Sequence, residues 1–264
     1  MKRLKTILLI VLGVYVLVGF LFYLLQERMI FMDGSLPDDH EFNFKSEFEE
    51  VYLEAPQEGR LHALHFRVDA PKGVILYYHG NKTSLDRWGK VVQYHVGLGY
   101  DVVVMDYRGY GKSKGQRNME MILADAQLFY DYTKARYEEK DIVVYGRSLG
   151  SGIASYVAAR NSPKQLILET PYYNFRQLVQ RYAPIYPIGL FLEYNFKSNE
   201  YLQEVACPVA IFHGTSDWVV PYSHGERLYQ SLPSDQGALY TIPEGGHADL
   251  VEYEVFRKGM EEVL

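Results

Sequence analysis

The sequence contains a single cysteine, Cys207, among its 264 residues. One thiol cannot form a disulfide within the chain, and no cysteines and histidines stand at the spacing of a zinc site. The fold must therefore be stabilised by a hydrophobic core, for which a chain of this length with 48% hydrophobic residues is ample. The same composition excludes a disordered, collagen-like or coiled-coil chain, and the sequence predicts no metal site.

The chain also lacks a basic cluster beyond its first residues. It has 27 Lys and Arg against 33 Asp and Glu, and a formal net charge of -6. Proteins that bind the phosphate backbone of nucleic acids need a stripe of positive charge. We therefore expect no nucleic-acid partner.

Charge is absent from the twenty residues between Thr6 and Leu25. As a helix this segment would be about 30 Å long, which matches the hydrocarbon thickness of a bilayer. A buried core helix would show a polar face, and a cleaved signal peptide would have a shorter apolar stretch with small residues at its cleavage site. The first alanine of the chain is Ala55. We therefore predict that residues 1–28 are an uncleaved membrane anchor.

The charges that flank this segment predict its orientation. Three basic residues precede it and mostly acidic residues follow it, so the positive-inside rule keeps the N-terminus cytoplasmic. After a linker at residues 29–46, the rest of the chain would lie on the opposite, periplasmic or extracytoplasmic, side. The basic residues are Lys2, Arg3 and Lys5, and the following charges are Glu27, Arg28, Asp33, Asp38 and Asp39.

Two kinds of hydrophobic pattern indicate strands in residues 47–264. Residues 48–55 and 60–68 alternate apolar and polar side chains, as two antiparallel strands joined at Glu58-Gly59 would. Six short apolar runs follow, mostly separated by segments long enough for a helix, as in a parallel sheet buried on both faces. We predict one doubly wound α/β domain. The runs are 74–78, 102–105, 142–145, 166–168, 209–212 and 238–242, and the expected helices are 85–98, 119–137, 149–160, 223–231 and 248–263.

One strand end carries a pattern typical of a catalytic serine. Ligands of open α/β sheets gather at the carboxyl ends of the strands. After the run 142–145 comes Gly146-Arg147-Ser148-Leu149-Gly150, followed by an expected helix. This strand-turn-helix setting is that of a nucleophile elbow, in which Ser148 would lie on a sharp, strained turn. Gly146 and Gly150 would keep the space around that turn free.

A nucleophilic serine needs a base, and the base needs an acid that orients it. Asp217 and His247 each follow a later apolar run, which gives the order Ser, Asp, His along the chain. His247 would take the Ser148 proton, and Asp217 would fix the imidazole tautomer. Separately, Asp217 could form a turn or cap a helix and His247 could be a surface histidine, but together they favour a triad. Glu169, also at a strand end, is the alternative acid.

Acyl transfer also requires two N–H donors for the oxyanion. The N–H of Leu149, directly after the nucleophile, is the first candidate. The N–H of Asn81, in the His-Gly-Asn sequence that follows the run 74–78, is the second.

Two further motifs at strand ends are expected to be structural. His79 and His213 each stand in a His-Gly pair outside the order of the triad. Residues 106–111 are punctuated by glycine but match neither a phosphate-binding loop nor a dinucleotide fingerprint. We predict a structural turn there.

Five motifs together resemble a known family. They are HGN at 79–81, DYRGYGKSKG at 106–115, YGRSLGSG at 145–152, HGTSDWVVP at 213–221 and GGH at 245–247. As a set they resemble the α/β-hydrolase superfamily, and are similar to membrane-associated hydrolases that include the eukaryotic depalmitoylating serine hydrolases and their bacterial relatives. The resemblance covers residues 47–264. It implies an eight-stranded, mostly parallel sheet, a triad of Ser148, Asp217 and His247, and hydrolysis of esters, thioesters or occasionally amides without a cofactor.

The chain departs from the depalmitoylating enzymes at its N-terminus. Those enzymes attach to membranes through a lipidated, cysteine-rich tail, whereas this chain has a hydrophobic span and only Cys207. The departure argues against protein depalmitoylation on the cytoplasmic face.

An aromatic insertion at about residues 172–201 falls between two expected strands, where a cap would cover Ser148. Its rings could line an acyl-chain pocket or lie at a membrane interface, or they could only pack the insertion onto the core. The aromatic residues are Tyr172, Tyr173, Phe175, Tyr182, Tyr186, Phe191, Tyr194, Phe196 and Tyr201.

We therefore expect a membrane-anchored serine hydrolase that cleaves carboxylic esters or thioesters of acyl or lipid-like substrates through an acyl-enzyme. Two alternatives remain open. The first is a serine peptidase or amidase that uses the same triad. The second is a membrane-tethered binding module that keeps the fold without the reaction.

Overall fold

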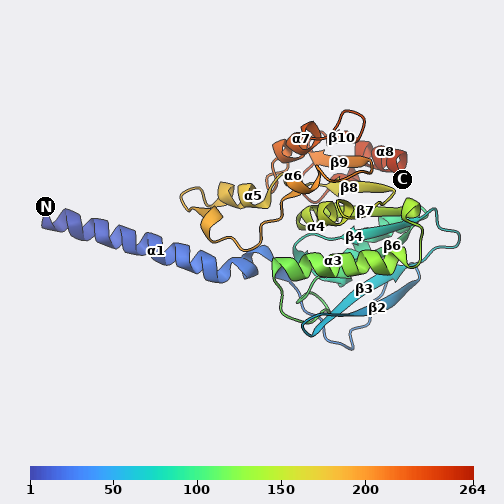
Figure 1. The fold of residues 1–264 in the computed structure, drawn as a ribbon, viewed down its shortest axis with the longest axis horizontal. Helices are drawn as coiled ribbons and strands as arrows, with labels where there is room; N and C mark the ends of the chain where they lie inside the picture. The colour runs from blue at the N-terminus through green and yellow to red at the C-terminus, as the bar shows by residue number, and fades with distance from the viewer.

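An eight-stranded sheet forms the centre of the computed structural model, which describes residues 1–264 (Figure 1). The strand order is β10-β9-β8-β7-β4-β6-β3-β2. β3 pairs antiparallel with both β2 and β6, and all other neighbours are parallel. The predicted fold class, an eight-stranded and mostly parallel α/β sheet, is confirmed. The strands are β2 (Phe48–Ala55), β3 (Gly59–Phe66), β4 (Val74–Tyr78), β6 (Asp101–Asp106), β7 (Ile142–Arg147), β8 (Gln165–Glu169), β9 (Val209–Gly214) and β10 (Gly237–Ile242).

Helices cover both faces of the sheet. α3 (Met119–Lys134), α4 (Leu149–Ala158) and α7 (Tyr222–Gln230) contribute to one hydrophobic core, and α2 (Leu85–Gly97) and α8 (Glu254–Val263) contribute to the other. Successive residues of a central strand enter opposite cores: Val144 lies in the first and Val143 in the second. Burial on both faces explains why the parallel strands are continuous apolar runs in the sequence.

The last helix begins later than its sequence pattern predicts. We expected one helix over 248–263, but Leu250–Glu252 forms a short 3-10 turn, Tyr253 is extended and α8 begins at Glu254. The Asp249 side chain accepts a hydrogen bond from the Gly246 N–H at 2.7 Å. Because this contact holds the loop after β10, the chain turns before the helix can start.

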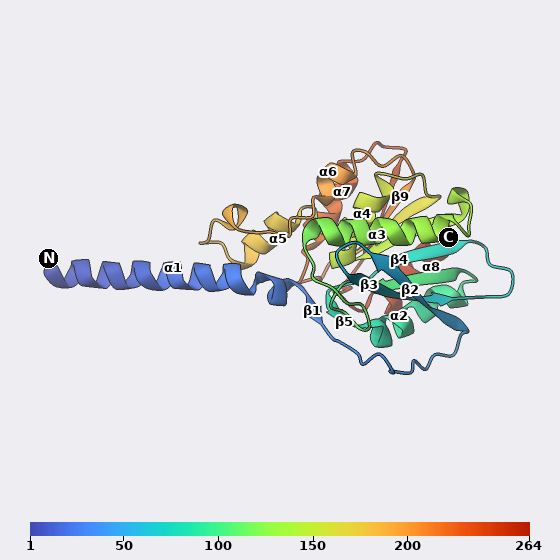
Figure 2. The same cartoon turned by 60° about the horizontal axis from the view of Figure 1, so that its bottom comes forward.

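α1 (Lys2–Ile30) is an apolar helix that extends away from the sheet (Figures 1 and 2). It is long and apolar enough to cross a membrane, and its most apolar stretch is not buried by the rest of the chain. Residues 29–46, which we expected to be a linker, begin with the end of α1. Phe31 is then buried, and β1 (Met32–Asp33) pairs with β5 (Lys82–Thr83). The end of α1 is therefore fixed beside the loop that follows β4.

The insertion lies beside α1 and contains two helices, α5 (Phe175–Tyr182) and α6 (Ser198–Tyr201), with a 3-10 turn at Ile188–Leu190 between them (Figure 1). Some of its aromatic rings pack the insertion onto the core, which is one of the alternatives expected from the sequence. Tyr194 and Phe196 are buried in that core. Tyr182, by contrast, is 56% exposed.

Candidate active site

Ser148 lies on the sharp turn between β7 and α4. Its φ of +51° and ψ of −116° are a strained backbone conformation that only close packing maintains. The Ser148 N–H donates to the Glu169 carbonyl at 2.9 Å, which ties the turn to β8. A Cβ atom at position 146 would lie 2.5 Å from the Gly150 carbonyl oxygen, and one at position 150 would overlap the Tyr78 carbonyl. Both glycines are therefore required by the space that the turn leaves.

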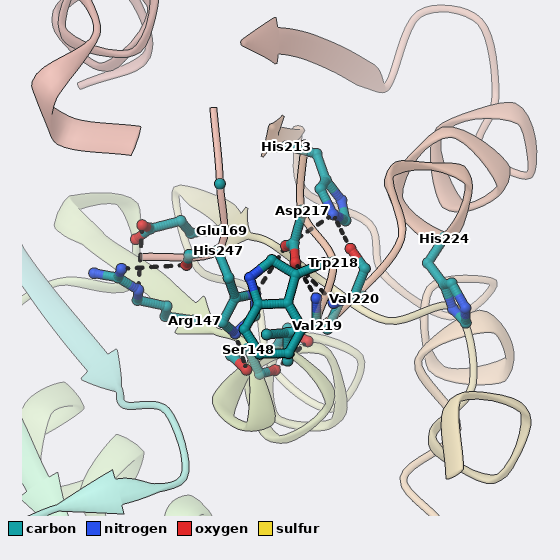
Figure 3. A network of polar contacts seen from close by, with 12 residues as sticks. Arg147, Ser148, Glu169, His213, Asp217, Trp218, Val219, Val220, His224 and His247 are labelled. Atoms are coloured by element: carbon teal, nitrogen blue, oxygen red, sulfur yellow. Dashed lines mark hydrogen bonds and ion pairs between the residues drawn. The ribbon is translucent and has the colours of Figure 1, made fainter. Parts of the chain in front are cut away.

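The structure brings Ser148, Asp217 and His247 together from three separate loops (Figure 3). His247 Nε2 lies 2.9 Å from the Ser148 hydroxyl oxygen, and His247 Nδ1 lies 2.8 Å from Asp217 Oδ2. Because a carboxylate only accepts hydrogen bonds, Nδ1 carries the proton and the Nε2 lone pair faces the serine hydroxyl. This is the geometry in which a histidine acts as general base toward a serine.

The buried carboxylate of Asp217 uses both of its oxygens. Oδ1 accepts the N–H groups of Val219 at 2.9 Å and Val220 at 2.8 Å, while Oδ2 faces His247. His213 lies 3.4 Å from Oδ2 and donates its Nε2–H to the Val220 carbonyl. Burial raises the pKa of Asp217, but the rings of His213 and His247 beside its carboxylate outweigh this effect and hold that pKa well below its usual value. Asp217 therefore both forms the turn and orients the imidazole as an anion.

Glu169, the alternative acid, does not contact the His247 ring. Its Oε1 lies 3.2 Å from Nε of Arg147, and its Oε2 accepts the Tyr145 hydroxyl at 2.7 Å. Arg147 in turn faces the His247 carbonyl at 3.5 Å (Figure 3). The pair therefore contacts the backbone of the His247 loop. No sequence motif indicated this contact of Arg147, and its position next to Ser148 was the one signal for it.

Both candidate oxyanion donors border Ser148. The N–H of Leu149 belongs to the first turn of α4, where backbone N–H groups have no intrahelical acceptor. The Asn81 side chain donates to the Ile30 carbonyl at 3.1 Å, whereas its backbone N–H has no acceptor in the protein. Gly80 brings this loop close, since a Cβ atom there would lie 3.6 Å from the Ser148 Cβ.

Two cavities meet at Ser148. One, of about 380 Å³, has apolar walls from the end of α1, through Met29 and Ile30, and from α5, through Phe175, Leu178 and Tyr182. The other, of about 310 Å³, is lined by three cations and by no carboxylate. The cations are Lys82, Arg87 and Arg147. The serine hydroxyl therefore lies between an apolar cavity and a positively charged one.

The motifs expected to be structural pack into the protein. His79 is buried, stacks on Trp88 with ring centroids 5.3 Å apart, and hydrogen-bonds the Gly80 carbonyl at 2.6 Å. In the glycine-punctuated loop after β6, Arg108 is buried and donates twice to Asp125, at 2.7 and 2.8 Å. This ion pair links the loop to α3.

Sequence comparison places the chain in a family. A family model described as "Serine aminopeptidase, S33" matches residues 69–197, a range that ends before Asp217 and His247. The chain is 31% identical over 280 residues to lysophosphatidylserine lipase ABHD12 of Danio rerio, covering 87% of this chain and 72% of that protein. The chain belongs to the α/β-hydrolase superfamily. It is also 28% identical over 181 residues to the uncharacterized protein YfhR of Escherichia coli, covering 66% of this chain and 63% of YfhR.

Solved α/β-hydrolase structures share the fold. The Pyrococcus furiosus esterase Pf2001 superposes with a TM-score of 0.67 at 18% identity, covering 86% of this chain and 94% of the esterase. Mouse alpha/beta hydrolase domain-containing protein 10 superposes with a TM-score of 0.60 at 17% identity, covering 81% and 96%. As predicted, this α/β hydrolase is a serine hydrolase of the ester-cleaving type.

Proposed function

We propose that this α/β hydrolase is anchored in a membrane and cleaves the acyl ester of a single-chain anionic lipid. The observation that carries the proposal is the position of the Ser148 hydroxyl, 2.9 Å from His247 Nε2 and between the apolar and the positively charged cavities. Relatives named lysophosphatidylserine lipases support a substrate of this class.

The reaction would proceed through an acyl-enzyme. His247 Nε2 takes the Ser148 proton as the serine oxygen attacks the ester carbonyl, and the N–H groups of Leu149 and Asn81 donate to the developing oxyanion. When the tetrahedral intermediate collapses, His247 returns the proton to the departing alkoxide. A water molecule deprotonated by the same nitrogen then hydrolyses the acyl-serine and releases the fatty acid.

The two cavities assign the two halves of the substrate. The acyl chain would occupy the apolar cavity of about 380 Å³, because burying its methylene groups there removes them from water. The alcohol half, with an anionic phosphate, would face Lys82 and Arg87 in the other cavity. A neutral alcohol would leave these cations without a partner.

The charges at the site disfavour an aminopeptidase, the activity in the name of the matching family model. An aminopeptidase must bind the positively charged α-amino group of its substrate. The charged residues that line the polar cavity are all cations. Asp217, the one carboxylate of the candidate triad, already accepts hydrogen bonds from His247 and two backbone N–H groups. A peptide N-terminus would therefore be repelled.

Residues 1–28 would anchor the chain, with the charge-free residues 6–25 crossing the bilayer, the N-terminus in the cytoplasm and residues 47–264 on the opposite side. The basic residues before the span and the acidic ones after it support this orientation. A tag after Leu264 should resist a protease added from the cytoplasmic side. Digestion of the tag from the cytoplasmic side would show that the orientation is the opposite of the one proposed.

The test of the proposed function is kcat/KM for oxyesters and thioesters from acetyl to palmitoyl, measured in detergent with Ser148→Ala as the blank. We expect kcat/KM to rise with acyl length and to vanish in the blank. A flat or falling profile would remove the long-chain lipid from the proposal. Cleavage of aminoacyl amides in preference to esters would replace it with a peptidase.

A further inference from the structure

A second apolar surface adjoins the membrane helix. Residues 182–192, here called the cap loop, read YAPIYPIGLFL and carry no charge between Arg181 and Glu193. Ile185 and Leu190 of this loop are 70% and 84% exposed. Large apolar side chains gathered on an uncharged loop mark a surface that binds another apolar phase.

The cap loop lies beside the C-terminal half of α1 in both views of the ribbon (Figures 1 and 2). Tyr186 stacks on Tyr15 with ring centroids 4.7 Å apart, and the Tyr15 hydroxyl donates to the Ile185 carbonyl at 2.9 Å. Gly19 makes room for this contact, since a Cβ atom there would lie 3.1 Å from the Tyr186 ring. A bilayer that surrounds α1 therefore also surrounds the cap loop.

Two glutamine side chains satisfy several backbone polar groups of the cap loop. Irregular backbone at membrane depth requires that its polar groups be satisfied within the protein. Gln180 Nε2 faces the carbonyls of Ala183 at 3.1 Å, Pro184 at 3.3 Å and Tyr186 at 2.9 Å. On α1, Gln26 donates to the Phe191 carbonyl at 3.1 Å and accepts the Glu193 N–H at 2.9 Å.

A narrow apolar cavity of about 110 Å³ lies between α1 and the cap loop, lined on one side by Phe22 and on the other by Ala183 and Phe191. Four residues line both this cavity and the larger one at Ser148. They are Met29, Ile30, Val179 and Tyr182. The narrow cavity beside α1 and the cavity at Ser148 therefore adjoin through these shared side chains.

We propose that the groove between α1 and the cap loop is a lateral port, through which the acyl chain of a membrane lipid ester passes from the bilayer leaflet to Ser148. The proposal rests on the proposed function and deepens it, because it names the membrane-resident lipid as the form of the substrate. The chain stays in apolar surroundings along this path, so it is never transferred into water. α1 then forms a wall of the substrate site as well as the anchor.

Ala183→Trp tests the port by filling the narrow cavity. The full chain in phosphatidylcholine vesicles is assayed with a palmitoyl lysophospholipid in the bilayer and with a butyryl ester added from water. We expect kcat/KM for the palmitoyl substrate to fall by roughly tenfold or more while butyryl hydrolysis is unchanged. The matched control is Leu24→Trp, on the lipid-facing side of α1, where Leu24 is 56% exposed and lines neither cavity. It should change neither rate.

Unchanged palmitoyl hydrolysis in Ala183→Trp would overturn the port. If both rates fell together, photolabelling would separate the two explanations. A palmitoyl lysophospholipid with a diazirine at the end of its acyl chain is bound to Ser148→Ala and photolysed, and the labelled residues are mapped. Labels on residues that line only the narrow cavity support the port, and labels confined to other residues contradict it. The residues that line only the narrow cavity are Phe22, Gln26, Ala183, Ile188, Phe191 and Leu192. Failure of the proposed function is a separate result: the wild-type chain would then hydrolyse neither ester in a Ser148-dependent way.

Discussion

Asp217 and His247 are joined by a hydrogen bond of 2.8 Å that uses only one oxygen of the carboxylate. The other oxygen accepts the N–H groups of Val219 and Val220. A turn that an aspartate forms from its own sequence neighbours thus fixes the direction of a carboxylate toward a histidine thirty residues away. The turn-forming and orienting roles of Asp217, which the sequence left as alternatives, are compatible in one side chain.

Asp217→Asn should reduce kcat by about three to four orders of magnitude with little loss of stability. The amide oxygen still accepts the turn N–H groups, but its NH2 group donates to His247 and imposes the wrong tautomer. Steady-state hydrolysis and the thermal midpoint, measured together, check this. Glu169→Gln is the control, because Glu169 does not contact the imidazole, and its kcat should fall far less. Equal losses in the two variants would contradict the assignment of the acid.

Arg87→Ala combined with Lys82→Ala should raise KM for a lysophospholipid with an anionic headgroup, by roughly tenfold. A neutral monoacylglycerol of the same chain length should be unaffected, because its alcohol half carries no phosphate. Lys90→Ala is the matched control, since Lys90 is exposed on the same helix as Arg87 and does not line the cavity at Ser148. A similar change in KM for both lipids would remove the anionic headgroup from the proposal.

His95→Phe should make stability less dependent on pH. Burial, with a smaller effect of Arg147, lowers the pKa of His95 from 6.5 to about 3, and neither ring nitrogen has a partner. Below pH 6.5 the unfolded chain therefore binds a proton that the folded chain does not, and the free energy of unfolding falls as pH is lowered. At pH 5, His95 should lower the free energy of unfolding by about 2 kcal/mol.

Denaturant titrations of wild type and His95→Phe at pH 7 and pH 5 measure the effect. The variant should be at least as stable at pH 7, because it removes two unpartnered polar atoms among the rings of Tyr77 and Tyr145. Between pH 7 and pH 5, the free energy of unfolding of the variant should fall by about 2 kcal/mol less than that of the wild type. An unchanged difference would show that His95 does not titrate as its burial requires.

Asp125→Ala should destabilise the protein by about 3–5 kcal/mol, because it leaves the buried Arg108 guanidinium without its carboxylate. The thermal midpoint in detergent checks this. Asp131→Ala, on the same helix, lacks an ion pair and should have little effect. If the two variants melted alike, the glycine-punctuated loop after β6 would not depend on this pair.

Much of the fold was predictable because local patterns carry it. Val143 and Val144 enter opposite cores, so the strand that holds them is apolar throughout, and the sequence marks it. The turn at Ser148 was predictable for a similar reason. The Tyr78 carbonyl approaches position 150 so closely that only glycine fits there, two residues after Ser148 in the sequence.

Contacts between distant segments were not predictable from such patterns. Nothing near Gln26 in the sequence indicates that its amide would meet Phe191, and the charge-free run 182–192 was seen only as part of an aromatic insertion. The late start of α8 also escaped prediction, because the contact of Asp249 with Gly246 overrides a helical pattern that is otherwise continuous. The link between Arg147 and the His247 loop belongs to the same class.

Labelling of the full chain in detergent with a fluorophosphonate, followed by mapping of the adduct by mass spectrometry, shows directly whether Ser148 is the nucleophile. We expect a single adduct on Ser148 that is absent from Ser148→Ala and His247→Ala and forms more slowly in the presence of a palmitoyl lysophospholipid. An adduct on another residue, or no adduct on a folded chain, would contradict the assignment of Ser148.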